Sequence, residues 1–206
     1  GTHHLEDGKL TLAYMPISRA DAPGWGRIKI VRDSCLDGRT LSLPAVMAYG
    51  PRAHLENEPY GWCWAATAFL DGHPRYHERF AKLRSMIKRA DFSQQLVDIY
   101  KRDWAELNEE WQVFIANLKY GYDFARMQID FRRGKPLPKG GSEVTVAADR
   151  GWQSSGILLE AGKTYQLSAA GRYLVGGKTK PWECEPAGIT IRYYYGLPLG
   201  VLLAAV

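Results

Sequence analysis

The stretch Tyr60–Phe80, YGWCWAATAFLDGHPRYHERF, decides the fold that this sequence predicts. In its first half almost every face of a helix would carry an apolar side chain, which is typical of a helix surrounded by protein. Glu58 and Pro59 come just before it, and an acid and a proline both suit the first turn of a helix. We therefore expect a central buried helix that begins after Asn57 and ends at Gly72.

Further helices are predicted on both sides of this one. Apolar residues recur at three- and four-residue spacing, each run bounded by capping or breaking residues, over residues 27–36, 42–47, 74–88, 93–100 and 103–118. A short strand, Leu10 to Tyr14, comes before them. The connections are short, and short connections imply antiparallel neighbours. An α-helical bundle is the expected result.

Beyond residue 142 the hydrophobic period changes from helical to two. Short strands separated by glycine-containing turns are predicted at Glu143–Ala147, Ile157–Leu159, Thr164–Ala169, Arg172–Val175, Ile189–Tyr193 and Val201–Val206. We expect an α+β protein in two domains. Its parts are an N-terminal helical bundle in residues 1–126, a Pro/Gly/basic linker in 127–142, and an antiparallel β-sandwich in 143–206, complete or cut short at the last residue.

The net charge of +5 is concentrated in the linker. Arg132, Arg133, Lys135 and Lys139 lie within eight residues that contain no acid. This pattern favours a solvated linker over a phosphate-binding patch, and we expect no nucleic-acid partner. No run reaches the roughly 18 apolar residues that a membrane span requires.

Cysteine and histidine spacing offers little metal chemistry. The three cysteines, Cys35, Cys63 and Cys184, form no C-x-x-C pair, and a Cys35–Cys63 disulfide is an open alternative in an oxidising compartment. His73 and His77 are four residues apart, the spacing of two zinc ligands on one helix face. Proline follows His73 where a zinc peptidase helix carries its glutamate, so a structural role is favoured and a metal site is the weaker alternative. No catalytic motif is found.

Aromatic residues of the second half are the candidate ligand surface. Trp152, Trp182 and the run Tyr193, Tyr194, Tyr195 exceed what packing of a small β domain needs. Aromatic rings on loops and edges can stack on sugar rings, whereas core or edge packing is the alternative interpretation.

Two segments resemble known families. NEPYGWCWAATAFLDGHPRYHERF (57–80) and DFSQQLVDIYKRDWAELNEEWQVFIANL (91–118) resemble the C-terminal helical part of the peptidase-MA-like, gluzincin-type family of bacterial proteins, especially those of planctomycetes. In that family the zinc-binding His-Glu-x-x-His helix precedes this part, so the resemblance implies no zinc ligand and no catalytic residue in this chain.

Residues 143–206 resemble, more loosely, the start of galactophilic-lectin-like sandwiches. The resemblance rests on Gly151–Gln153, Ala161–Lys163, Ala169–Gly171 and Leu199–Leu203. It implies sugar and calcium binding in loops that would follow this strand.

Two functions are expected from these resemblances. The first is the C-terminal fragment of an exported metallopeptidase-like protein, with zinc held by the upstream half of the same protein and a β-sandwich as accessory binding module. The second is a non-catalytic cell-surface or envelope glycan-binding protein. The start at Gly1 and the apolar end, Val201–Val206, lead us to expect a fragment. We expect no hydrolysis and no stoichiometric zinc from this chain itself.

Overall fold

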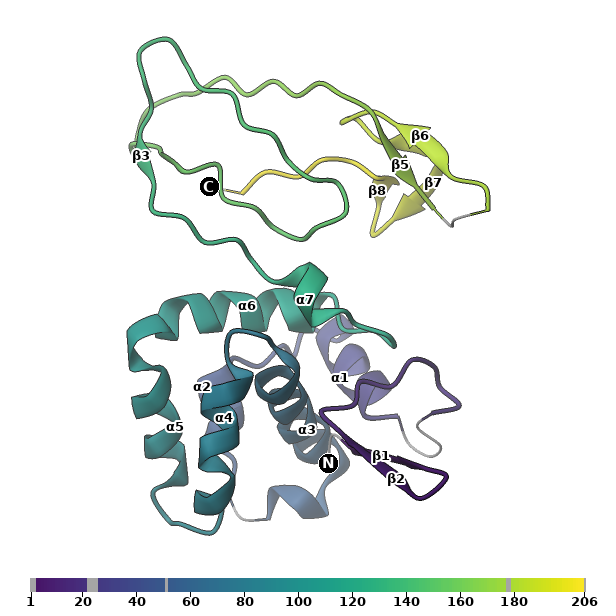
Figure 1. Ribbon diagram of the computed structural model, residues 1–206, viewed down its shortest axis with the longest axis vertical. Coiled ribbons are helices and arrows are strands. Elements are labelled where there is room, and N and C mark those ends of the chain that lie inside the picture. Colours follow the sequence, from purple (N-terminus) through teal and green to yellow (C-terminus); the bar gives the residue numbers. More distant parts are fainter. Residues whose placement is uncertain (1–2, 22–25, 51, 177–178, 206) are drawn as a thin grey trace. The chain divides into compact units, whose positions relative to one another are not determined.

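The computed structural model describes residues 3–21, 26–50, 52–176 and 179–205. The chain divides into two compact units, Gly1–Ile129 and Asp130–Val206 (Figure 1). This division falls within the linker predicted at residues 127–142. Each unit is described by itself below.

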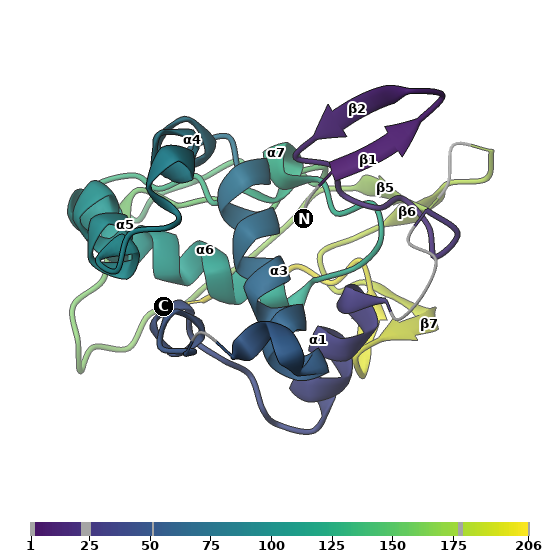
Figure 2. The ribbon, with the colours of Figure 1, turned by 90° about the horizontal axis from the view of Figure 1, so that it is seen from below.

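The first unit is mainly helical. Its helices are α1 (Arg27–Leu36), α2 (Leu43–Met47), α3 (Asn57–Gly72), α4 (His77–Leu83), α5 (Phe92–Tyr100), α6 (Trp104–Ala116) and α7 (Phe124–Met127), with single 3-10 turns at Ala53–Leu55, Arg84–Met86 and Lys101–Asp103. An antiparallel hairpin, β1 (His3–Glu6) and β2 (Lys9–Leu12), precedes them. The central helix is confirmed, since α3 contacts α1, α2, α4 and α6 and runs through the middle of the helices (Figure 2).

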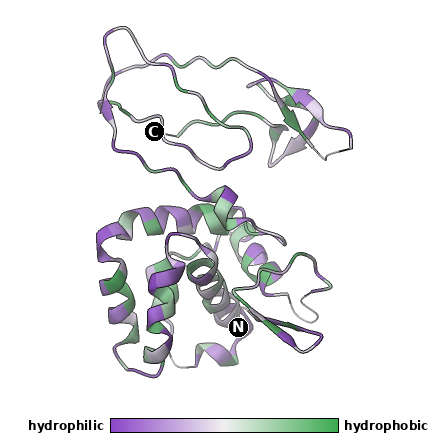
Figure 3. Cartoon of the chain, in the orientation of Figure 1, coloured by the Kyte–Doolittle hydropathy of each residue, from purple (hydrophilic) through white to green (hydrophobic). Residues whose placement is uncertain are grey.

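Aromatic side chains fill the core of this unit. The Phe69 ring of α3 lies 5.7 Å from Tyr76, 5.6 Å from Trp111 and 5.5 Å from Phe114, centroid to centroid, and all four side chains are fully buried. The Trp111 indole N–H donates to the Leu41 carbonyl over 2.9 Å, which satisfies the one polar atom of that side chain. In Figure 3 the helices around α3 carry both hydrophobic and hydrophilic residues, as burial of one face of each helix requires.

Two glycines allow neighbours to approach α3 closely. A Cβ added at Gly61 would lie 3.0 Å from Cγ2 of Ile30 in α1, and one added at Gly72 would lie 2.5 Å from Cε2 of Phe124 in α7. The first contact, with the Ser34–Glu58 hydrogen bond of 2.9 Å, shows that α1 and α3 run antiparallel. All three cysteines are free thiols.

The second unit corrects the expected fold class. The strands among its described residues form three two-stranded sheets: β3 (Lys135–Pro136) with β4 (Ile157–Leu158), β5 (Tyr173–Val175) with β6 (Trp182–Cys184), and β7 (Ile189–Tyr194) with β8 (Leu197–Leu199). The predicted C-terminal β-sandwich is therefore wrong, and the chain is a mixed protein of helices and small two-stranded sheets.

The physical reason is the lack of two sheet faces that bury one another. The predicted strands at 143–147, 164–169 and 201–205 have no strand structure. Within the described part of this unit Cys184 is the only buried residue, while Leu167, Leu174 and Ile191 are 70%, 67% and 71% exposed. A sandwich core needs such residues to face inward from both sheets.

Candidate functional site

The two histidines of the weak zinc prediction lie in different environments. His73 follows the last turn of α3 and is 3% exposed, whereas His77 begins α4 and is exposed. The His73 Nδ1 accepts the Arg75 backbone N–H over 3.2 Å, so we assign the imidazole proton to Nε2. In the described ranges no three His, Cys, Asp or Glu side chains are grouped as a metal site would need.

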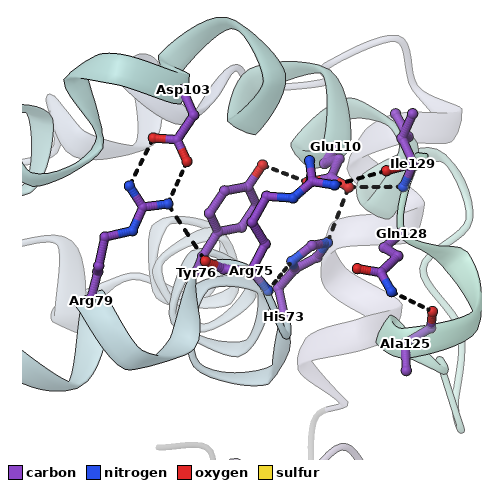
Figure 4. Close-up of polar contacts among 9 residues, drawn as sticks. All are labelled: His73, Arg75, Tyr76, Arg79, Asp103, Glu110, Ala125, Gln128 and Ile129. Carbon is purple, nitrogen blue, oxygen red and sulfur yellow. Dashed lines mark hydrogen bonds and ion pairs between the residues drawn. The ribbon is translucent and has the colours of Figure 1, made fainter. Parts of the chain in front are cut away.

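His73 instead belongs to a buried polar cluster centred on Glu110 of α6 (Figure 4). The Glu110 carboxylate accepts the Tyr76 hydroxyl and, over 2.8 Å, the Ile129 backbone N–H. The His73 Nε2 lies 3.3 Å from Oε1, close but not aligned as a hydrogen bond, and the Arg75 Nη1 lies 3.5 Å from Oε2. We call these five residues the Glu110 cluster.

Electrostatics keep the carboxylate of this cluster ionised. Burial alone would raise the pKa of Glu110, but contacts with His73, the Tyr76 hydroxyl and the Ile129 N–H outweigh it and hold that pKa below its ordinary value. Burial, and then the carboxylate beside it, raise the pKa of the Tyr76 phenol well above its ordinary value. Tyr76 is therefore a hydrogen-bond donor at neutral pH, with Glu110 as its charged acceptor.

The cluster fixes the end of the first unit. Arg75 Nη2 donates to the Ile129 carbonyl over 3.0 Å, while Glu110 accepts the N–H of the same residue. Both backbone polar groups of Ile129 are thus satisfied by side chains. Glu110, Tyr76 and His73 are each no more than 3% exposed, so these contacts hold the chain in place from within the core of the unit.

A second ion pair joins α4 to the start of α6. Arg79 donates to both carboxylate oxygens of Asp103, one bond measuring 2.8 Å, and its guanidinium lies 4.7 Å from the centre of the Tyr100 ring. The Arg79 side chain holds the pKa of Asp103 below its ordinary value. The paired, stacked guanidinium is a packing element of this unit.

The aromatic candidates of the second unit are largely exposed. Tyr193 and Tyr194 are each 57% exposed, Tyr195 is 67% exposed and Trp182 is 43% exposed. Trp152 is half-buried in a different part of the unit, where its carbonyl accepts the Asp130 N–H. The structure therefore brings the three tyrosines together on one hairpin and places Trp152 elsewhere.

The hairpin of β7 and β8 presents these tyrosines at its tip. Tyr194 pairs with Leu197, which leaves a two-residue turn, Tyr195–Gly196, with φ angles of 48° and 77°. Both angles are positive, as in the type I′ turn that suits two-residue hairpins. The Tyr194 and Tyr195 rings meet edge to face with centroids 4.5 Å apart.

Trp182 belongs to the neighbouring hairpin of β5 and β6. The Cys184 thiol of β6 lies 3.7 Å from the carbonyl oxygens of both Leu199 and Gly200, so the end of β6 contacts the end of β8. The Tyr173 hydroxyl of β5 also donates to the Gly200 carbonyl. Burial and the Cys184 thiol raise the pKa of Tyr173 to about 12. The two hairpins therefore share one small packed contact.

Known proteins offer no guide to the function of this chain. Comparison with protein-family models, with curated proteins and with solved structures found no match for this chain. In the part of the chain that the structure describes, no helix is both long and apolar enough to cross a membrane.

Proposed function

We propose that this chain is a non-catalytic binding protein that holds carbohydrate on the exposed tyrosines of the β7–β8 hairpin, Tyr193, Tyr194 and Tyr195. The helical unit is the structural part of the molecule in this proposal. Its Glu110 cluster is buried and stabilises the fold.

Exposure of the aromatic rings supports the proposal. A tyrosine ring buries well in a core, yet these three consecutive rings are each more than half exposed. The C–H face of a pyranose packs on such a ring while the phenol oxygen hydrogen-bonds to sugar hydroxyls or water. A side chain with an apolar body and a polar tip suits a ligand of that mixed character.

The observation that carries the proposal is the backbone of Tyr195. Its φ of 48° lies in the left-handed region, which costs a residue with a Cβ about 1 kcal/mol or more. Asparagine, aspartate or glycine would fill the first position of this turn with less strain. At that position the exposed Tyr195 gains for the fold only its edge-to-face contact with Tyr194, which favours a further role in contacting a ligand.

The resemblance of the helical unit to peptidase-MA-like proteins stays a prediction. It concerns residues 57–80 and 91–118, whereas the zinc-binding helix of that family would precede them.

A glycan array probed with the 206-residue chain, with and without calcium, tests the proposal. We expect retention on a subset of glycans. The sharpest variant is Tyr195→Asn, which removes one ring and relieves the turn. Stacking of one ring is worth about 1 kcal/mol, so glycan affinity should fall by about fivefold to tenfold while the melting temperature stays equal or rises.

Leu167→Ser is the matched control. Leu167 is 70% exposed in the same unit and carries no ring, so its loss should leave glycan retention unchanged. Absence of binding to every glycan, or equal affinity in the wild-type chain and Tyr195→Asn, would remove the proposal.

A further inference from the structure

The charge pattern around the tyrosine hairpin points to a class of ligand. From Pro186 to Val206 the sequence contains one charged residue, Arg192. It directly precedes Tyr193, Tyr194 and Tyr195 in β7, and its side chain is exposed. One exposed arginine thus directly precedes three exposed tyrosines in the sequence, in a segment that has no acid of its own.

Arg192 differs from the nearest arginine in the neighbouring hairpin. Arg172, beside β5, contacts the carboxylates of Glu183 and Glu185 at 3.1 Å and 3.2 Å. Within the described residues Arg192 has no such carboxylate. Its five N–H donors are therefore open to a ligand.

The local backbone also sets Arg192 apart. In the β7–β8 ladder Ile189 pairs with Leu199, and the next pair is Tyr193 with Pro198. The three β7 residues between these pairs, of which Arg192 is the last, therefore have no partner residue in β8, as in a β-bulge. Such bulges redirect side chains out of the regular strand alternation and are common beside binding sites. Arg192 is thereby released from regular cross-strand pairing next to the tyrosines.

We infer that the glycan bound by this hairpin is acidic, with a uronate carboxylate held by Arg192 and the pyranose faces held by Tyr193–Tyr195. This inference rests on the proposed function. A planar guanidinium matches a carboxylate with two parallel hydrogen bonds, which a lysine ammonium cannot reproduce. A polymer of uronic acids offers a sugar face and a carboxylate in every residue, which match the exposed tyrosines and the exposed arginine of this one hairpin.

The test compares two forms of one polymer. Polygalacturonate and its fully methyl-esterified form have the same sugar ring, and only the first carries a carboxylate. We expect the wild-type chain to bind polygalacturonate at least fivefold more tightly, with a preference that shrinks as salt is added because an exposed charge contact is screened. A sulfated polysaccharide in a third arm distinguishes a carboxylate preference from a general preference for anions.

Substitutions separate a specific contact from the attraction of a basic protein to a polyanion. Arg192→Gln should abolish the preference for the acidic form, and Arg192→Lys should retain only part of it. Arg150→Gln is the matched control, because Arg150 is exposed in the same unit and its substitution removes the same charge. Circular dichroism of each variant checks that the fold is kept.

The outcomes distinguish failure of the acidic-glycan inference from failure of the proposed function. Equal binding of the acidic and esterified polymers keeps carbohydrate binding and overturns the role of Arg192. An equal loss in Arg150→Gln and Arg192→Gln, or a stronger response to sulfate than to carboxylate, also overturns it. Binding to no glycan at all overturns both.

Discussion

Replacement of Glu110 by glutamine tests the role assigned to the buried cluster. Glutamine keeps the size of the side chain but removes the charge and turns one acceptor oxygen into a donor. That donor must face either the Tyr76 hydroxyl and Arg75 or the Ile129 N–H and His73, which are themselves donors. Loss of one hydrogen bond to a charged acceptor, together with the charge attraction between Glu110 and Arg75, should cost about 3 kcal/mol of unfolding free energy.

That cost is a large share of the stability of a typical domain, about 5–15 kcal/mol. Urea unfolding followed by far-UV circular dichroism at neutral pH measures it. Glu109→Gln is the matched control, since Glu109 is the preceding residue of α6 and is exposed. We expect the control to change stability by less than about 0.5 kcal/mol. A similarly small change in Glu110→Gln would refute the reasoning.

The same pair of proteins has a defined pH dependence. The pKa of Glu110 lies below its ordinary value of 4.5, so folding releases protons from this group in acid. Its stabilising contribution is complete above that ordinary value and is lost as the pH falls through the lowered folded pKa. The stability difference between the wild-type chain and Glu110→Gln should therefore shrink in acid. A difference that grew with acidity would contradict the assignment of an ionised carboxylate.

Further substitutions test the packing of the helical unit, each by urea unfolding. Gly72→Ala should destabilise by about 1–3 kcal/mol, the reverse of the usual gain from alanine in a helix, because its Cβ would lie 2.5 Å from Phe124 Cε2. Arg79→Lys should lower the free energy of unfolding by about 1 kcal/mol, because lysine cannot keep both hydrogen bonds to Asp103. Arg89→Lys should leave the stability nearly unchanged, because the Arg89 side chain is 60% exposed. A stabilising Gly72→Ala, or equal losses in the two arginine variants, would contradict these contacts.

The helices were predictable because their signals are local. The apolar run after Pro59 and the boundary at Gly72 are properties of neighbouring residues, and α3 has these bounds within one or two positions. The stripe predicted over residues 103–118 corresponds to α6, whose side chains Leu107, Trp111 and Phe114 are fully buried. Local periodicity of this strength leaves few alternative conformations.

The prediction of a β-sandwich was wrong because it rested on alternation alone. Alternating apolar residues show that a strand can form, but a sandwich also requires partners for each strand and a second sheet to cover its apolar face. Leu167 and Leu174 fit the alternation and are 70% and 67% exposed. Glycines with positive φ, such as Gly156 and Gly171, interrupt the extended segments and shorten the strands.

The Glu110 cluster escaped prediction because its members are joined only in three dimensions. The sequence does contain one signal. On α6, Glu110 lies three residues after Leu107 and four before Phe114, within the buried stripe, whereas Glu109 lies outside it. A carboxyl group in that buried position must either be ionised with polar or cationic partners or be protonated, since burying an unpaired charge is too costly. Its side-chain partners His73, Arg75 and Tyr76 lie in the second half of the stretch that decides the fold. The turn after α3 therefore both completes the aromatic core and fixes Ile129 at the end of the helical unit.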